Sequence, residues 1–134
     1  MEEYIRNICE PYLHLEFVVY VLRSVTNTNL MYVGYTNNIV RRLRQHNGII
    51  KGGGKYTSAN RPWKLAALVP VEDKSDAIKV EYWSKAKNYK SQAGIPRNDP
   101  VIRRKYLLEL SMKKHGYTEV IYTEVIYIDE EFKI

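Results

Sequence analysis

The sequence has one cysteine, two phenylalanines and no long apolar run among its 134 residues. The single thiol, Cys9, excludes an internal disulfide and any cysteine-based zinc site within the chain. We expect Cys9 to be a small buried or half-buried residue, and its isolation fits the reducing interior of a cell. No segment has the ~20 apolar residues needed to cross a bilayer. We therefore predict a soluble, intracellular protein of the cytoplasm or nucleus that has no membrane partner.

Acidic residues are also in deficit. The chain has 21 lysines and arginines against 15 aspartates and glutamates, which gives a net charge of +6. A basic excess favours an anionic partner, most commonly nucleic acid, although many basic surfaces are only solvated. Tyrosine is abundant, with 12 copies. Phenols can be half-buried core residues, catalytic groups or platforms that stack on bases, so their positions must decide between these roles.

Residues 17–24 and 30–36 are predicted to be strands, because both are rich in β-branched and aromatic side chains and turn residues separate them. Two strands this close in sequence should form an antiparallel hairpin. Asn37 or Asn38 can then cap a helix that runs to about His46. This hairpin and helix are the part of the sequence with the clearest local signals.

An Asn-Gly pair ends that helix, and residues 48–62 are predicted to be a basic, glycine-rich loop. Residues 63–71 read as a third strand. Asp73 or Ser75 can cap a second helix that ends near residue 89. We expect four apolar residues to form its buried face: Ile78, Tyr82, Ala86 and Tyr89.

The C-terminal part is predicted to form a helix over residues 100–114 and a strand over 117–128, where the segment YTEVI occurs twice in succession. We expect this strand to pair at a sheet edge, within the chain or between two chains of a homodimer. The order ββαβα predicts an α+β fold with a small three-stranded, mixed or antiparallel sheet flanked by helices. A single domain over residues 1–134 should have its core at about 15–90 and a helix–strand extension at about 97–134.

Five side chains along this order supply the groups that phosphodiester hydrolysis needs. They are Tyr20 and Tyr32 on the two hairpin strands, Arg42 and His46 on one face of the next helix, and Glu81 on the second helix. A carboxylate can hold a hard divalent cation that acts as a Lewis acid. An arginine can neutralise charge on phosphoryl oxygens, and a phenol or imidazole can orient or deprotonate water.

Each of these residues also has an ordinary structural explanation. The tyrosines can simply fill their strands. Arg42 can be one of several solvated cations on its helix, and the helix dipole can favour His46 near the C-terminal end. Glu81 can pair with Lys85 at the i,i+4 spacing, a contribution of only ~0.3–0.5 kcal/mol. None of these explanations predicts the five residues in this order.

A series of short motifs follows the chain from residue 17 to residue 90: Val18-Val19-Tyr20, Tyr32-Val33-Gly34, VRRLRQHNG at 40–48, Gly53-Gly54, Tyr56-Thr57, Arg61-Pro62-Trp63, and Ala77 through Glu81 to Trp83. Together they resemble the GIY-YIG nuclease superfamily, in particular the catalytic domain of the Slx-type structure-selective endonucleases. The first motif departs from the family pattern, because valine stands at position 18 where the family has glycine.

The resemblance implies a metal-dependent DNA endonuclease that acts on flaps or other branched DNA in repair, recombination or genome processing. It implies that Tyr20 and Tyr32 line the site, that Arg42 contacts the scissile phosphate with help from His46, and that Glu81 binds Mg²⁺ or Mn²⁺. Slx-type enzymes also carry a zinc-binding RING-like module that docks a scaffold partner. A chain with one cysteine cannot form that module, so we expect no scaffold partner docked through it.

DNA contacts are expected from four residues of the glycine-rich loop: Lys51, Lys55, Tyr56 and Arg61. The same loop can instead be a mobile surface segment. Five basic residues of the third helix either extend the basic track or form a solvated face: Arg103, Arg104, Lys105, Lys113 and Lys114. The alternative function is a catalytically inactive nucleic-acid-binding module of the same fold. Retention of both Arg42 and Glu81 favours the enzyme.

Overall fold

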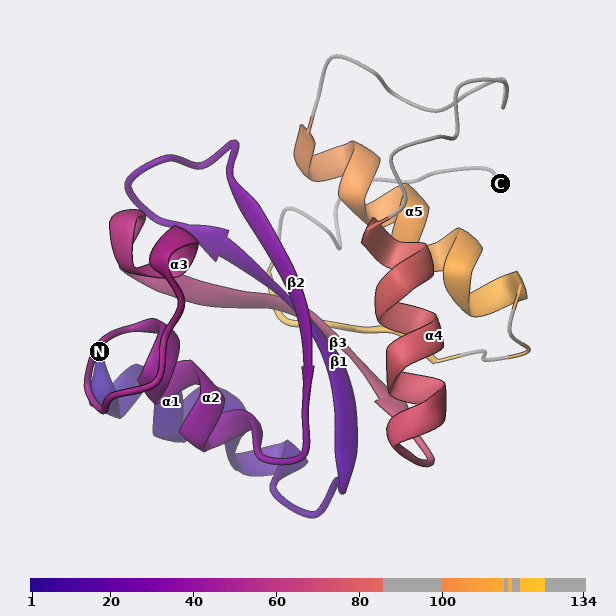
Figure 1. Ribbon diagram of the computed structural model, residues 1–134, viewed down its shortest axis with the longest axis horizontal. Coiled ribbons are helices and arrows are strands. Elements are labelled where there is room, and N and C mark those ends of the chain that lie inside the picture. The colour runs from indigo at the N-terminus through magenta and orange to yellow at the C-terminus, as the bar shows by residue number, and fades with distance from the viewer. Residues whose placement is uncertain (86–99, 115, 117–118, 125–134) are drawn as a thin grey trace.

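The structure is a computed structural model that describes residues 1–85, 100–114, 116 and 119–124. The elements run in this order: α1 Glu2–Cys9, the 3₁₀ turn η1 Glu10–Tyr12, β1 Phe17–Ser24, β2 Met31–Thr36, α2 Ile39–His46, α3 Lys55–Ala59, β3 Trp63–Val71, α4 Lys74–Lys85, α5 Pro100–Lys114 and β4 Ile121–Tyr122. The strands form one antiparallel sheet in the order β2-β1-β3-β4. Helices α1 and α2 cover one face of this sheet, and α4 and α5 cover the other (Figure 1).

The central strand β1 contributes to both cores. Val19 and Val21 pack with α4 and α5, whereas Tyr20 and Leu22 pack with α1 and α2. Successive side chains of a strand point to opposite faces, so a strand covered on both sides is apolar throughout. Burying each Val or Leu contributes about 1.5–3 kcal/mol. This alternation puts the Tyr20 phenol on the same face of the sheet as α2.

The predicted hairpin and the helix after it are confirmed. The side chain of Asn38 accepts a hydrogen bond from the backbone N–H of Arg41 at 3.0 Å and so caps α2. Ile39 and Leu43 anchor the helix in the core. Gly48 follows the helix with φ +75°, a conformation that glycine adopts without strain. The α2 residues that carry chemistry are therefore held by local signals at both ends of the helix.

The loop prediction for residues 48–62 is wrong over five of those residues, which form the helix α3. Two hydrogen bonds to its backbone hold this short helix. The Trp63 indole N–H donates to the Thr57 carbonyl at 2.8 Å, and the Asn60 amide donates to the Tyr56 carbonyl at 2.7 Å. Helix α1 was also not predicted; its Ile5 and the predicted buried Cys9 lie in the core against α2.

The predicted buried face of the second helix is wrong. Ile78 and Tyr82 are 48% and 69% exposed, and α4 instead buries Ala77, Val80 and Ser84. These small side chains let the helix lie close to the sheet and to α5, which a face of large residues would prevent. The other two residues of the predicted face, at 86 and 89, lie outside the described residues. The cap at Asp73 is confirmed by its bond to the backbone N–H of Asp76 at 2.8 Å.

The C-terminal strand joins the sheet as its fourth member, so the predicted α+β class is confirmed with a wider sheet. Ile121 and Tyr122 pair with β3 of the same chain. Arg23 on β1 and Glu124 form an ion pair at 2.6 Å between two largely buried side chains. The rest of the predicted strand over 117–128 lies mostly outside the described residues. No helix in the described part of the chain is long and apolar enough to cross a membrane.

Candidate functional site

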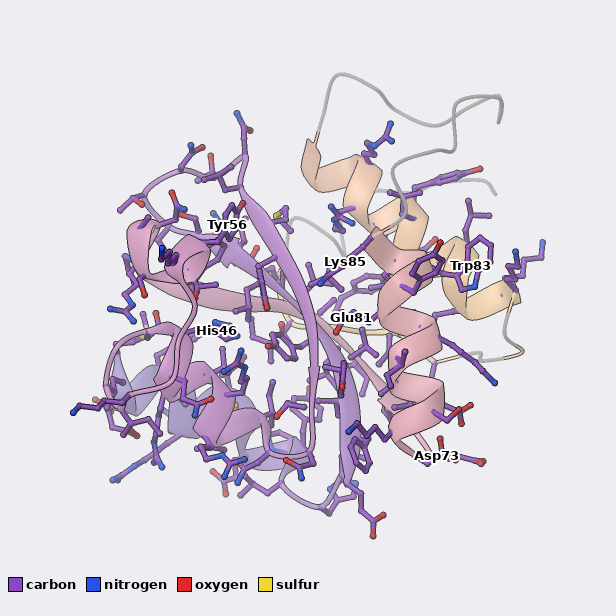
Figure 2. The ribbon with its side chains drawn as sticks, viewed as in Figure 1. His46, Tyr56, Asp73, Glu81, Trp83 and Lys85 are labelled. Carbon is purple, nitrogen blue, oxygen red and sulfur yellow. The ribbon has the colours of Figure 1, made fainter. Side chains whose placement is uncertain are left out.

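The predicted site residues gather around β2, the edge strand of the sheet. The Tyr20 and Tyr32 rings lie 6.3 Å apart between centroids, and the His46 ring lies 4.9 Å from that of Tyr32. Figure 2 shows His46 on the side of α2, with Glu81 and Lys85 extending from α4 toward the sheet. The site thus draws on both helical layers, which meet around the sheet edge.

The hydrogen bonds around His46 favour the tautomer that is protonated on Nδ1. The hydroxyl of Thr57 donates to the Gly54 carbonyl at 3.3 Å, so the Thr57 oxygen accepts from His46 Nδ1 at 3.0 Å. A neutral imidazole protonated on Nδ1 has an acceptor at Nε2. In this tautomer the Tyr20 hydroxyl, 2.7 Å from Nε2, donates a hydrogen bond to His46. The phenol oxygen is left to accept from other groups.

Burial sets the protonation states of this pair. His46 is 1% exposed, and burial together with the nearby Arg42 and Arg61 cations lowers the pKa of His46 to about 4. Burial also raises the pKa of the Tyr20 phenol, a shift that the bond from Arg42 partly opposes. At neutral pH the pair is thus an uncharged imidazole that accepts a hydrogen bond from an intact phenol.

Arg42 is fixed beside the phenol by three acceptors. Its Nη1 donates to the Gln45 side chain at 2.8 Å and to the Gly52 carbonyl at 3.0 Å, and its Nε approaches the Tyr20 oxygen at 3.4 Å. Partial burial alone would lower the pKa of Arg42, but the phenols of Tyr20 and Tyr32 raise it. The guanidinium is therefore a fixed positive charge, unlike a freely solvated surface cation.

Gly34 makes room for the Tyr20 hydroxyl. It stands opposite Tyr20 in the β1–β2 register. A Cβ atom at position 34 would lie 2.5 Å from the Tyr20 oxygen and 3.1 Å from the ring of Tyr32. Only glycine leaves the phenol oxygen in its present position between His46 and Arg42. This close approach is the physical reason for glycine at the end of the Tyr32-Val33-Gly34 motif.

Glu81 faces the other side of this cluster. Its carboxylate, 21% exposed, pairs with Lys85 Nζ at 3.0 Å, and that ammonium lies 5.6 Å from the centroid of the Tyr32 ring. The Lys85 ammonium thus lies between the Glu81 carboxylate and the Tyr32 ring, which places the carboxylate near the phenol cluster. In the part of the chain that the structure describes, no three His, Cys, Asp or Glu side chains form a ready metal site.

The four predicted DNA-binding residues of the loop fall into two groups. Lys51, Lys55 and Tyr56 are exposed, and the Tyr56 ring stacks over Tyr32 at 6.2 Å. Arg61 instead donates to the His46 carbonyl at 2.8 Å. Its guanidinium therefore supports the end of α2, and the DNA contact predicted for Arg61 stays a prediction.

Two residues of the site were not predicted, Thr57 and Gln45. Thr57 orients the imidazole from α3, an element that the sequence did not predict, and Gln45 holds the guanidinium of Arg42. Thr57 belongs to the Tyr-Thr motif and Gln45 to the RRLRQH motif, but the motifs alone did not assign a function to either residue.

Comparison with known proteins agrees with this geometry. Residues 16–95 match the family model described as the GIY-YIG catalytic domain. The chain is 45% identical over 69 residues to structure-specific endonuclease subunit SLX1 of Podospora anserina, which covers 49% of this chain and 20% of the relative. With the subunit of the same name from Debaryomyces hansenii, identity is 48% over 79 residues, 55% of this chain and 23% of the relative.

A relative of similar size is also found. UPF0213 protein YsiG of Lactococcus lactis is 36% identical over 103 residues, which cover 75% of this chain and 94% of that protein. The chain thus spans about a fifth of the length of the SLX1 relatives but nearly all of the YsiG relative. The matched range holds every residue of the Tyr20–His46–Arg42–Glu81 cluster. The chain belongs to the GIY-YIG family.

Proposed function

We propose that this protein is a metal-dependent DNA endonuclease that hydrolyses phosphodiester bonds. The observation that carries the proposal is the fixed guanidinium of Arg42, whose neighbour is a phenol with its own proton acceptor. A preorganised cation beside a general base stabilises the charge that develops on phosphoryl oxygens as water attacks. The names of the SLX1 relatives, structure-specific endonuclease subunits, support the same activity.

The directions of the hydrogen bonds around Tyr20 give the direction of proton transfer. Water bound beside Arg42 gives its proton to the Tyr20 oxygen, while the Tyr20 proton moves to His46 Nε2 over the 2.7 Å bond. The hydroxide attacks phosphorus, the bond to the leaving oxygen breaks, and solvent protonates the leaving group. Thr57 holds the Nδ1 proton of the resulting imidazolium. Burial opposes protonation of His46 most strongly, followed by the Arg42 charge, and the anionic phosphate offsets the Arg42 contribution.

The residues present fit one divalent cation of the Mg²⁺ or Mn²⁺ type. Mg²⁺ is commonly held by one or two carboxylates, with water and substrate phosphates completing its shell. Glu81 offers one carboxylate near the phenol cluster. When bound, the metal would supply Lewis-acid stabilisation of phosphoryl oxygens. The Lys85 ammonium pairs with one oxygen of the Glu81 carboxylate. A metal ion that binds this carboxylate must therefore displace the ammonium.

The finer features of the proposal concern substrate and setting. The substrate is proposed to be flap or branched DNA, in repair, recombination or genome processing, because the SLX1 relatives are named structure-specific. The single buried Cys9 fits a reducing interior such as the cytoplasm or nucleus.

The predicted homodimer stays a prediction, and sedimentation at high protein concentration tests it. β4 already pairs within one chain.

The test compares cleavage of flap, junction and plain duplex DNA by the purified chain in Mg²⁺ and in EDTA. Glu81→Gln should abolish Mg²⁺-dependent cleavage, because the carboxylate that holds the metal is lost. Glu72→Gln, at an exposed carboxylate before α4, is the matched control and should cleave like the wild type. Cleavage that survives Glu81→Gln would overturn the metal assignment, and binding without any cleavage would favour the inactive module.

A further inference from the structure

An open groove of about 300 Å³ lies next to the site, and none of Tyr20, Tyr32, Arg42, His46 and Glu81 lines it. Three segments line it: the end of the β1–β2 turn, α3 and the first turns of α5. The lining residues are Asn29, Leu30, Met31, Tyr56, Arg103 and Arg104. Figure 1 shows the β1–β2 turn and the beginning of α5 at the same end of the molecule. The groove therefore begins where the α5 layer approaches the edge strand.

Tyr56 connects this groove to the catalytic cluster. Its ring stacks on Tyr32 at 6.2 Å with an angle of 29° between planes, and Tyr32 lies 4.9 Å from the His46 ring. The Tyr56 ring also lies 5.9 Å from the ring of Trp63, but the residue is 45% exposed and lines the groove, so part of its surface is open to a ligand there. An exposed aromatic ring in line with a phosphodiesterase site can stack on an unpaired base.

The groove is also basic. Arg103 and Arg104 are half-buried, and Arg104 Nη1 bonds the Ser84 carbonyl at the end of α4, which orients its side chain. The neighbouring Lys105 does not take part, because it is 6% exposed and lies over the Tyr122 ring. Only part of the predicted basic track of α5 thus reaches the groove. Guanidinium groups contact phosphate oxygens bidentately.

We propose that this groove binds a single-stranded DNA segment continuous with the scissile strand. A base stacks on Tyr56, and the backbone phosphates lie against Arg103 and Arg104. A paired base would have its faces covered by its neighbours in the duplex, so the exposed ring selects an unpaired strand. Helix α5 lies beyond the range of 16–95 that the family model matches. The proposal rests on the nuclease function and names part of its substrate.

The experiment measures fluorescence anisotropy in EDTA with a duplex that carries a single-stranded arm and with the same duplex without the arm. Tyr56→Ala and Arg103→Gln should each weaken binding of the armed DNA about fivefold or more, and binding of the plain duplex less than about twofold. Tyr56→Phe should retain the affinity, because it keeps the stacking ring. Tyr82→Ala and Lys113→Gln, at an exposed tyrosine on α4 and an exposed lysine on α5, are the matched controls and should bind like the wild type.

Several results would overturn the groove assignment. They are an equal loss on both DNAs, no loss on either, failure of the wild type to bind the armed DNA, or displacement of the arm by poly-glutamate as readily as by unlabelled single strand. The nuclease proposal fails separately. The wild type can fail to cleave any DNA and still bind the armed DNA more tightly in a way that depends on Tyr56. That result would support single-strand binding in the groove and contradict the nuclease function.

Discussion

At the scale of single residues, the proposed catalysis depends on which nitrogen of His46 carries the proton. Thr57 accepts from His46 Nδ1, and this leaves Nε2 free to take the proton of Tyr20. His46 itself could be predicted, because it stands one turn after Arg42 on a helix with clear boundaries. Thr57 could not, since its bond reaches back 11 residues from a helix of five residues without a side-chain cap.

Thr57→Val tests this role, because it keeps the shape of the side chain and removes the hydroxyl. We expect cleavage to slow about tenfold, the cost of one buried hydrogen bond in the transition state. The ¹⁵N shifts of His46 should show loss of the Nδ1-protonated tautomer, which a purely structural role would leave unchanged. Thr57→Ser should restore both properties. A valine variant with the wild-type tautomer and rate would contradict the proton path.

The lowered pKa of His46 predicts a pH dependence of stability. The unfolded histidine titrates near 6.5, whereas the folded one has a pKa of about 4, so the unfolded state binds more protons between these values. The neutral His46 contributes its full share to the free energy of unfolding above about pH 6.5, and this share is lost as the pH falls toward 4. The loss between pH 7 and pH 5 is about 2 kcal/mol.

Denaturant unfolding at these two pH values checks the effect. His46→Gln lacks the titrating group and should lose about 2 kcal/mol less unfolding free energy than the wild type over this interval. His14→Gln, at an exposed histidine, is the control and should follow the wild type. Identical losses in His46→Gln and the wild type would show that His46 is not held neutral by the fold.

At the scale of elements, local signals explain what could be predicted. The hairpin and α2 were predictable because β-branched residues, turn residues and an Asn38 cap all act within a few residues. Helix α3 was not, because its cap is Gly54 and it follows two further glycines. The buried face of α4 was misassigned because the contact favours small residues, as at Ala77 and Ser84, and that preference comes from the partner layers.

The spacing of Glu81 and Lys85, one turn apart on α4, predicts that Lys85 competes with a metal ion for the carboxylate. Lys85→Gln removes the ammonium that competes for the Glu81 carboxylate at 3.0 Å. We expect the affinity for Mn²⁺ alone, measured by electron paramagnetic resonance titration, to rise about fivefold, consistent with an ion pair of ~1 kcal/mol. Lys79→Gln, at an exposed lysine of the same helix, should leave the affinity unchanged. Equal affinities in Lys85→Gln and the wild type would remove Lys85 from the metal site.

At the scale of the whole molecule, the sheet edge explains how residues from both helical layers meet. Tyr20 lies on the α2 face, while Glu81 comes from the helix that covers the opposite face. β2 is the outer strand, so side chains from both layers can approach each other around it. The order of motifs predicted which residues belong together. Their meeting at an edge depends on the strand order β2-β1-β3-β4, which no local pattern specifies.

Arg42, as a fixed cation, is proposed to stabilise the transition state. The single-turnover cleavage rate of Arg42→Ala tests this role beside that of Arg41→Ala, which removes the adjacent, exposed cation of the same helix. We predict that Arg42→Ala slows cleavage about 10²–10³-fold while DNA binding and thermal unfolding change little. Arg41→Ala should cleave at the wild-type rate. Equal rates for the two variants would contradict the assignment of the active site.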